Sequence, residues 1–211
     1  MNASVATPGR FRILTVCTGN ICRSPLAEYL LRKGLERWDV VDVASSGTGA
    51  LVGHSMTDQT IAIAHQHGVP DPERHRARAL VVEHLRHADL VLALSREHRS
   101  EIVSLLPRGS RHTFTVRELA RLLEAVQAAD LAAVAALPLA DTAARFSELV
   151  HAAAALRGYV TPPENEVDDD VIDPYRRGDD VYQQTVEQLV PAIDVILDRF
   201  KLAAAITSVE G

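Results

Sequence analysis

The sequence predicts an α/β fold in which a parallel β-sheet is flanked by helices. Short apolar runs rich in strand-forming residues are separated by stretches whose apolar residues recur at helical spacing. Strands that alternate with helices favour a parallel sheet, because a helical crossover returns the chain to the same end of the sheet. A composition of 47% apolar and 24% charged residues is that of a globular protein with a sizeable core.

Four runs are predicted to be strands, and they cover residues 11–17, 40–45, 88–95 and 111–116. A helix is expected from Ser24 onward, where Pro25 occupies a first-turn position. Further helical patterns cover residues 57–67 and 179–205. The last of these has a continuous apolar side, so we expect it to pack on the sheet.

The segment 117–160 differs from the rest of the chain in composition, because alanine and leucine dominate it. Pro138 divides it into two helical halves. We interpret it as a helical-hairpin insertion within a single domain that spans residues 10–211. Two interpretations of the hairpin stay open: core packing of two extra helices, or a surface role as a lid or a dimer interface. The acid-rich stretch 164–170 is expected to be an exposed loop.

The overall composition argues against several classes of protein. A net charge of −6 without a basic block gives little support for nucleic-acid binding. The N-terminus MNASVATPGR lacks the apolar core of a signal peptide, and no run approaches the roughly 18 apolar residues that span a bilayer. We therefore expect no membrane association and a cytoplasmic location. Cys17 and Cys22, the two cysteines, cannot form the multi-bridge framework of a small secreted domain.

Residues 17–25, CTGNICRSP, carry the strongest functional signal in the sequence. They place a thiol, Cys17, at the end of a strand and Arg23 at the start of a helix. Main-chain amides of such a loop, the helix N-terminus and a guanidinium form a cradle for a tetrahedral oxyanion. The same field stabilises a thiolate, so Cys17 would attack without a general base. Gly19 permits the close approach that a phosphate needs. The alternative is a buried strand-end cysteine beside a tight turn, but the C-x5-R-S-P spacing favours the functional interpretation.

The string CTGNICRSP resembles the signature of the low-molecular-weight protein tyrosine phosphatases, which place this loop near the N-terminus. Similarity continues at residues 45–49, 75–78 and 171–175, and covers most of residues 10–116 and 168–200. The resemblance implies a four-stranded parallel sheet flanked by helices, doubly wound in the flavodoxin-like order. The insertion at 117–160 departs from minimal members of the family.

The resemblance also implies roles for particular residues. Cys17 attacks the phosphoryl group to give a cysteinyl-phosphate, and Arg23 binds the phosphoryl oxygens. Asp173 protonates the leaving group and then activates the water that hydrolyses the intermediate, although an Asp-Pro pair is also a common turn opener. The phosphate-binding loop would comprise Thr18, Gly19, Asn20, Ile21 and Cys22.

Further positions match residues that support the loop or contact the substrate. Ser24 would hydrogen-bond the thiolate and act as the helix N-cap. Asn20, Ser45 and His75 would hold the loop in its strained shape, although His75 could instead be a solvated loop histidine.

Tyr175 and Leu51 would sandwich the phosphotyrosine ring. Leu51 replaces a bulky aromatic residue of some relatives. Cys22 would form a reversible disulfide with Cys17 under oxidation, or else it is a small residue packed beneath the loop.

The expected partner is a phosphotyrosine protein, including a bacterial tyrosine kinase of polysaccharide export; no cofactor and no metal are expected. An arsenate reductase on the same scaffold is the nearest rival. No cysteine follows Cys22 to resolve the intermediate within the chain, so the alternative that stays open is a reductase that uses an external thiol. A non-catalytic phosphate-binding module is the other rival. It would not need a proton donor such as Asp173.

Overall fold

The computed structural model describes residues 9–207, and its centre is a four-stranded parallel sheet in the order β2-β1-β3-β4. The strands are β1 (Phe11–Cys17), β2 (Val41–Gly47), β3 (Leu90–Ala93) and β4 (Thr113–Thr115). The predicted fold class and strand order are therefore confirmed. Residues 1–8, which include most of the segment in which no signal peptide is expected, and residues 208–211 lie outside the described part.

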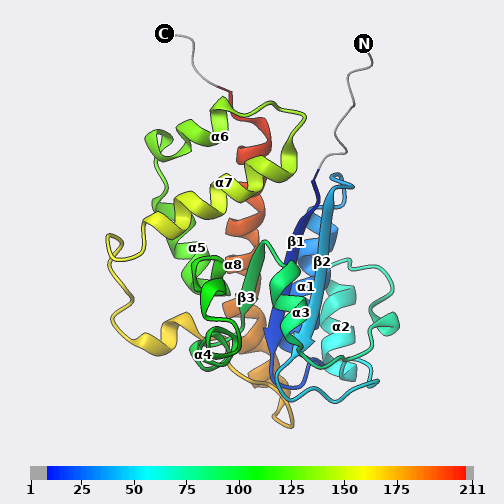
Figure 1. Cartoon of the computed structure of the whole chain (residues 1–211). Coiled ribbons are helices and arrows are strands. Elements are labelled where there is room, and N and C mark those ends of the chain that lie inside the picture. Colours follow the sequence, from blue (N-terminus) through cyan, green and yellow to red (C-terminus); the bar gives the residue numbers. More distant parts are fainter. Residues whose placement is uncertain (1–8, 208–211) are drawn as a thin grey trace.

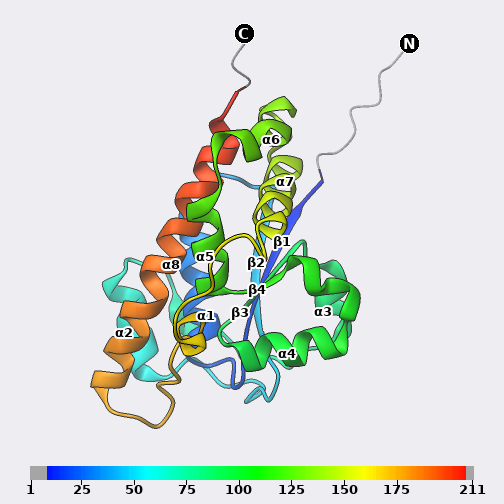
Figure 2. The ribbon, with the colours of Figure 1, turned by 90° about the vertical axis from the view of Figure 1, so that its left-hand side faces the viewer.

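Helices cover both faces of this sheet (Figures 1 and 2). In chain order they are α1 (Arg23–Gly34), α2 (Asp58–Gln66), α3 (Val82–His87), α4 (Arg96–Leu105), α5 (Val116–Ala125), α6 (Ala132–Ala136), α7 (Thr142–Ala155) and α8 (Asp179–Ala205). Short 3-10 segments are η1 (Pro72–Arg74), η2 (Pro107–His112), η3 (Ala128–Leu131) and η4 (Glu166–Asp169). Figure 2 shows α1, α2, α5 and α8 on one side of the sheet and α3 and α4 on the other. Within residues 9–207, no helix combines the length and hydrophobicity that a membrane crossing requires.

The alternation of side chains along β1 builds two cores at once. Phe11 and Ile13 belong to the large core shared with α1, α5, α7 and α8. Leu14 and Val16 point the other way, into a smaller core with residues of α3 and α4. Because both faces are covered, the strand is apolar almost throughout, as expected for a buried parallel strand.

The segment 117–160 forms the rest of α5, η3, α6 and α7, so it holds more helical pieces than the two expected. Pro138 lies between α6 and α7, where the predicted division falls. Phe146 of α7 is fully buried, with its ring centroid 5.6 Å from that of Phe11, 5.5 Å from Trp38 and 4.6 Å from Phe200. These aromatic contacts favour the core-packing interpretation of the insertion.

Arg145, also on α7, is fully buried and joins the insertion to the end of α8. Its Nε donates to the carbonyl of Ala203 at 2.8 Å, and its other guanidinium nitrogens donate to the carbonyls of Leu137 and Ile206. The last carbonyls of a helix lack partners within the helix and carry partial negative charge. Arg145 therefore caps α8 from a neighbouring helix.

His98 on α4 connects that helix to the loop after β1. Its Nε2 lies 2.9 Å from Thr18 Oγ1 and its Nδ1 lies 2.8 Å from the hydroxyl of Ser95, the N-cap residue. The side chain is buried, and this burial, assisted by the positive charge of Arg23, lowers the pKa of His98 to about 4. The imidazole is therefore neutral near pH 7.

We predict that Arg145→Met lowers the free energy of unfolding by about 3 kcal/mol, because one buried and two partly buried carbonyls lose a charged donor that is itself fully buried. Urea unfolding at pH 7 measures the change. The control is Arg86→Met, since Arg86 and its partner Glu83 are 50% and 62% exposed. Loss of such a surface pair should change stability by about 0.5 kcal/mol or less. Equal unfolding midpoints for the two variants would contradict the capping role.

We also predict that His98 makes the protein less stable in acid. Its pKa is lower in the folded state than in the unfolded chain, so the unfolded chain takes up the proton first. The stabilisation is complete above the unfolded pKa of about 6.5 and is lost as pH falls toward the folded pKa. Between pH 7 and pH 5 the wild type should lose about 2 kcal/mol more than His98→Gln. Parallel curves of unfolding free energy against pH would refute this prediction.

Candidate active site

A cavity of about 150 Å³ lies where β1 ends and α1 begins. Three segments distant in sequence line it: the loop after β1, the segment after β2, and the segment before α8. Its lining residues are Cys17, Thr18, Gly19, Ile21, Cys22, Arg23, Gly49, Leu51, Asp173 and Tyr175. Ligands of open α/β sheets bind at the carboxyl ends of the strands, which is where this cavity lies.

The thiol of Cys17 is buried at the end of β1, and its Sγ lies 3.0 Å from the hydroxyl of Ser24. The prediction that Ser24 is also the N-cap of α1 is wrong. The helix begins one residue earlier, at Arg23, and the N-cap position is Cys22, whose side chain makes no capping hydrogen bond. The hydroxyl of Ser24 instead lies between Cys17 and Asn20, because the loop curls back over the first turn of the helix.

Asn20 shapes the loop. Its φ angle is 54°, in the left-handed region that asparagine adopts more readily than most residues, and its side chain is completely buried. Nδ2 donates to the hydroxyls of Ser24 at 2.9 Å and Ser45 at 2.8 Å. Oδ1 accepts from the backbone N–H of Arg78 at 2.9 Å, and the Asn20 carbonyl lies 2.7 Å from His75 Nε2. Four hydrogen bonds thus hold a strained residue in place.

His75 and Ser45 therefore lie behind the loop and do not line the cavity. Because His75 Nε2 faces a carbonyl oxygen, this nitrogen carries the proton and donates it. Burial lowers the pKa of His75, which keeps the ring neutral. Ser45 in turn donates to Glu28 of α1 at 2.6 Å.

The segment after β2 is hydrogen-bonded along the loop after β1. The amides of Thr48, Gly49 and Leu51 donate in order to the carbonyls of Cys17, Thr18 and Gly19, each at 3.0 Å. These bonds turn Leu51 toward the cavity.

The end of β2 and the loop after β1 lie so close together that a glycine, Gly47, is required at this position. A Cβ atom at Gly47 would lie 2.3 Å from the Thr18 carbonyl oxygen, so any larger residue would push the two segments apart.

Arg23 lies between the loop and the segment that carries Asp173. Its side chain is 6% exposed; Nη1 donates to the Val171 carbonyl at 3.1 Å, and Nη2 lies 2.7 Å from Asp173 Oδ2. Its buried Nε makes no hydrogen bond within the described part of the chain. Asp173 is half exposed, and its Oδ1 accepts from the Tyr175 amide at 3.2 Å, so it opens a turn as well as facing the cavity.

Cys22 lies beside the cavity, with its Sγ 3.7 Å from Thr57 Oγ1 and 3.8 Å from the hydroxyl of Tyr182. Burial raises the pKa of the Cys22 thiol and raises that of Tyr182 to about 12. Both groups are therefore protonated near neutral pH. Cys17 and Cys22 are both free thiols in this structure.

Sequence reasoning missed some residues that contact the site. Arg78 donates from Nε to the Ser45 carbonyl at 2.6 Å, and it lay within a matching stretch without being assigned a role. The sequence gives His98 one signal, its place three residues after a serine at a helix start. This spacing predicts a capping contact with that serine, but it does not predict the contact with Thr18. Within residues 9–207, no cluster of three or more His, Cys, Asp or Glu side chains is arranged to hold a metal ion.

Comparison with known proteins places these features in one family. The family model described as low molecular weight phosphotyrosine protein phosphatase matches residues 12–134. The low molecular weight protein-tyrosine-phosphatase Etp of Escherichia coli is 44% identical over 104 residues, which cover 48% of this chain and 68% of that protein.

Two solved structures show the likeness in three dimensions. The low molecular weight protein tyrosine phosphatase of T. tengcongensis is 27% identical with a TM-score of 0.61, covering 89% of this chain and 98% of that chain. The YwlE arginine phosphatase of Geobacillus stearothermophilus is 25% identical with a TM-score of 0.61, covering 90% of this chain and 93% of that chain. Family model, sequence and structure agree, and the chain belongs to the low molecular weight protein-tyrosine-phosphatase family.

Proposed function

We propose that this protein tyrosine phosphatase hydrolyses phosphotyrosine through a cysteinyl-phosphate formed on Cys17. The observation that carries the proposal is the convergence of Cys17, Arg23 and Asp173 on one cavity with apolar walls. A nucleophile, an oxyanion-binding guanidinium and a carboxyl group are the three functions that transfer from a tyrosine ester requires.

In the first step, the Cys17 thiolate attacks phosphorus while the bond to the tyrosine oxygen breaks. The main-chain amides of the loop and the guanidinium of Arg23 neutralise the three equatorial oxygens. Asp173 delivers its proton to the departing phenolate, which has a conjugate acid of pKa about 10 and leaves poorly as an anion.

In the second step, water attacks the cysteinyl-phosphate, and the carboxylate of Asp173 accepts a proton from that water. The bond between phosphorus and Cys17 Sγ breaks, and inorganic phosphate is released. The hydroxyl of Ser24, 3.0 Å from Cys17 Sγ, donates a hydrogen bond to the departing thiolate.

The walls of the cavity support an aromatic phosphate ester as substrate. Ile21, Leu51 and Tyr175 supply apolar surface, and an aromatic ring can stack between them. A phosphoarginine substrate, as in the arginine phosphatase relative, would bring a positively charged guanidinium. Among the described lining residues, Asp173 is the single carboxylate, and it is paired with Arg23. The cavity chemistry therefore favours phosphotyrosine.

The two rival functions explain less of the site. An arsenate reductase that resolves its intermediate within the chain needs a further thiol, and the sequence has none after Cys22. A binding module would need Arg23 but would gain nothing from a carboxylate 2.7 Å from that guanidinium, where it competes with the phosphate.

We propose a phosphotyrosine protein as the partner, including an autophosphorylated bacterial tyrosine kinase. At the cavity mouth, Tyr175 is 38% exposed and its ring lies 5.1 Å from the guanidinium carbon of Arg176, so both can contact a protein chain. A cytoplasmic location, where thiols stay reduced, is supported by the need for a free Cys17.

We predict that Cys17→Ser lowers turnover of p-nitrophenyl phosphate by at least about 1,000-fold, because a serine hydroxyl is not ionised at neutral pH. Steady-state kinetics measure the loss, and circular dichroism verifies that the variant is folded. Turnover that persists in Cys17→Ser would overturn the mechanism. Arsenate reduction by a wild-type protein that lacks phosphatase activity would favour the reductase.

We also predict that Asp173→Ala traps substrates, because binding persists while the leaving group is no longer protonated. The measurement is a pull-down from the native cell, with bound proteins analysed by mass spectrometry for phosphotyrosine and phosphoarginine. Tyrosine-phosphorylated proteins, including a tyrosine kinase, should be retained and released by added inorganic phosphate. Enrichment of phosphoarginine proteins instead would contradict the proposed substrate class.

A further inference from the structure

We propose that Arg96 and Asp170 form a positioning pair that holds the general acid Asp173 over the cavity. The inference rests on the proposed function, because it concerns the residue that protonates the leaving group. It assigns a role to two residues outside the cavity, neither of which touches the reacting atoms.

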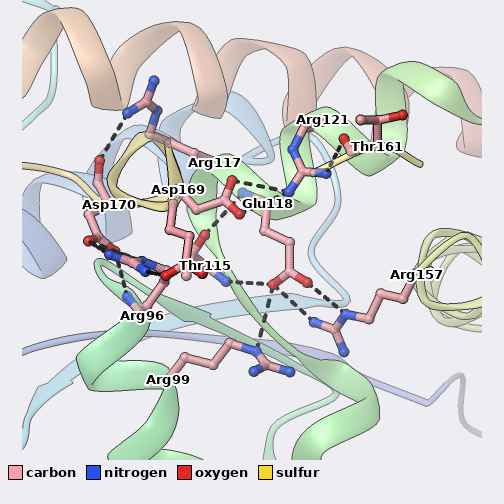
Figure 3. Close-up of polar contacts among 11 residues, drawn as sticks. Arg96, Arg99, Thr115, Arg117, Glu118, Arg121, Arg157, Thr161, Asp169 and Asp170 are labelled. Carbon is pink, nitrogen blue, oxygen red and sulfur yellow. Dashed lines mark hydrogen bonds and ion pairs between the residues drawn. The ribbon is translucent and has the colours of Figure 1, made fainter. Parts of the chain in front are cut away.

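Asp170 uses both carboxylate oxygens to bind the start of α4 (Figure 3). Its Oδ1 accepts the backbone N–H of Arg96 at 2.7 Å, and its Oδ2 lies 3.2 Å from Arg96 Nη2. The Arg96 guanidinium also pairs with Glu166 at 2.6 Å. Charged hydrogen bonds with several contacts on one carboxylate are stronger and more directional than single surface pairs.

The stretch 164–170, expected to be an exposed loop, is therefore fastened along its second half. Part of it is the 3-10 segment η4, and Asp169 pairs with Arg121 at 2.9 Å. Arg117 donates to the Asp170 carbonyl at 3.1 Å (Figure 3). Residues 164–168 are exposed, as expected, whereas Asp169 and Asp170 are only partly exposed. Arginines from α4 and α5, far away in sequence, supply the partners of these two side chains.

The backbone is held on both sides between Asp170 and Asp173. The amide of Val171 donates to the Leu94 carbonyl at 2.9 Å, and the Val171 carbonyl accepts from Arg23. These two hydrogen bonds join residues 170–173, the acid segment, to the end of β3 on one side and to Arg23 on the other.

The backbone of Ile172 is also held on both sides, in this case by two residues of α8. Its amide donates to Gln188 Oε1 at 2.8 Å, and its carbonyl accepts from Thr185 Oγ1 at 3.2 Å. The side chain of Asp173, in contrast, is 51% exposed, and its contacts are with Arg23 and the Tyr175 amide. The backbone that precedes it decides where this side chain begins.

Arg96 connects residues 170–173 to the part of the chain that carries the nucleophile, Cys17. It directly follows the junction of β3 and α4, where the Leu94 amide donates to the Val16 carbonyl, one residue before Cys17, at 2.9 Å. A misplacement of about 1 Å can lower a rate by about 100-fold. Release of Asp170 from Arg96 should therefore impair proton delivery while leaving the loop around Cys17 intact.

The test compares two esters whose leaving groups differ in their need for a proton. Phenolate is a strong base and needs the acid, whereas p-nitrophenolate is a much weaker base and needs it less. The quantity is kcat/KM, which reports all steps through release of the phenol. For Arg96→Met we expect kcat/KM to fall by about tenfold with phenyl phosphate and by about threefold or less with p-nitrophenyl phosphate.

The matched control is Arg157→Met. Arg157 pairs with Glu118 of α5 at 2.8 Å and, like Arg96, is partly exposed. Its contacts are with Glu118, Ser110, Thr113 and the Phe114 ring, and none of them is with residues 166–173. It should lower the melting temperature without changing the ratio of kcat/KM for the two esters. All assays are run well below the melting temperatures of the variants.

A double-mutant cycle tests the pair itself. Asp170→Ala should shift the ester ratio in the same direction, and the double variant Arg96→Met/Asp170→Ala should be no worse than the more severe single variant. Should Arg96→Met fold poorly, Arg96→Lys keeps the charge but not the paired geometry, and an intermediate ratio is expected.

The outcomes separate the two levels of the proposal. If the wild type is active but Arg96→Met lowers kcat/KM for both esters equally, as a change in stability alone would, the positioning role is overturned. The same holds if Arg157→Met shifts the ratio as much. A wild type that hydrolyses neither ester overturns the proposed function, and the positioning role with it.

Discussion

The site depends on one buried asparagine in a left-handed conformation. Asn20 turns the chain between β1 and α1 so that Cys17 and Arg23 face the same cavity, and its amide holds Ser24 beside the thiol. Hydrogen bonds with Ser45 and His75 offset the backbone strain. Glycine at the end of β2 lets the next segment approach the loop closely enough to bind it.

The acid segment and the nucleophile loop meet at the junction of β3 and α4. His98 contacts Thr18 in the loop, whereas Arg96 holds Asp170 in the segment that leads to Asp173. One short stretch of chain thus fixes both halves of the site relative to the sheet. Arg23 then joins the halves directly, since its guanidinium contacts the carbonyl of Val171 and the carboxylate of Asp173.

The segment 117–160 contributes mainly to the core. Phe146 packs among aromatic rings at one end of the sheet, and Arg145 caps the last turn of α8. The described lining of the cavity includes no residue from this segment. We propose that α6 and α7 bury apolar surface on the elements they cover, whereas Arg117 and Arg121 of α5 contact the stretch that leads to Asp173.

Sequence alone determined what depends on neighbours along the chain: the strand and helix runs, and a thiol and guanidinium spaced by one loop. Resemblance added Asp173 and the residues behind the loop. Tertiary structure decided the contacts across long separations, such as His98 with Thr18, 80 positions apart, and Arg96 with Asp170, 74 apart. It also decided that α1 begins at Arg23, so Ser24 lies in the first turn and is not the N-cap. Local spacing encodes periodicity and turns, whereas which distant polar groups pair is fixed only when the sheet and helices close around them.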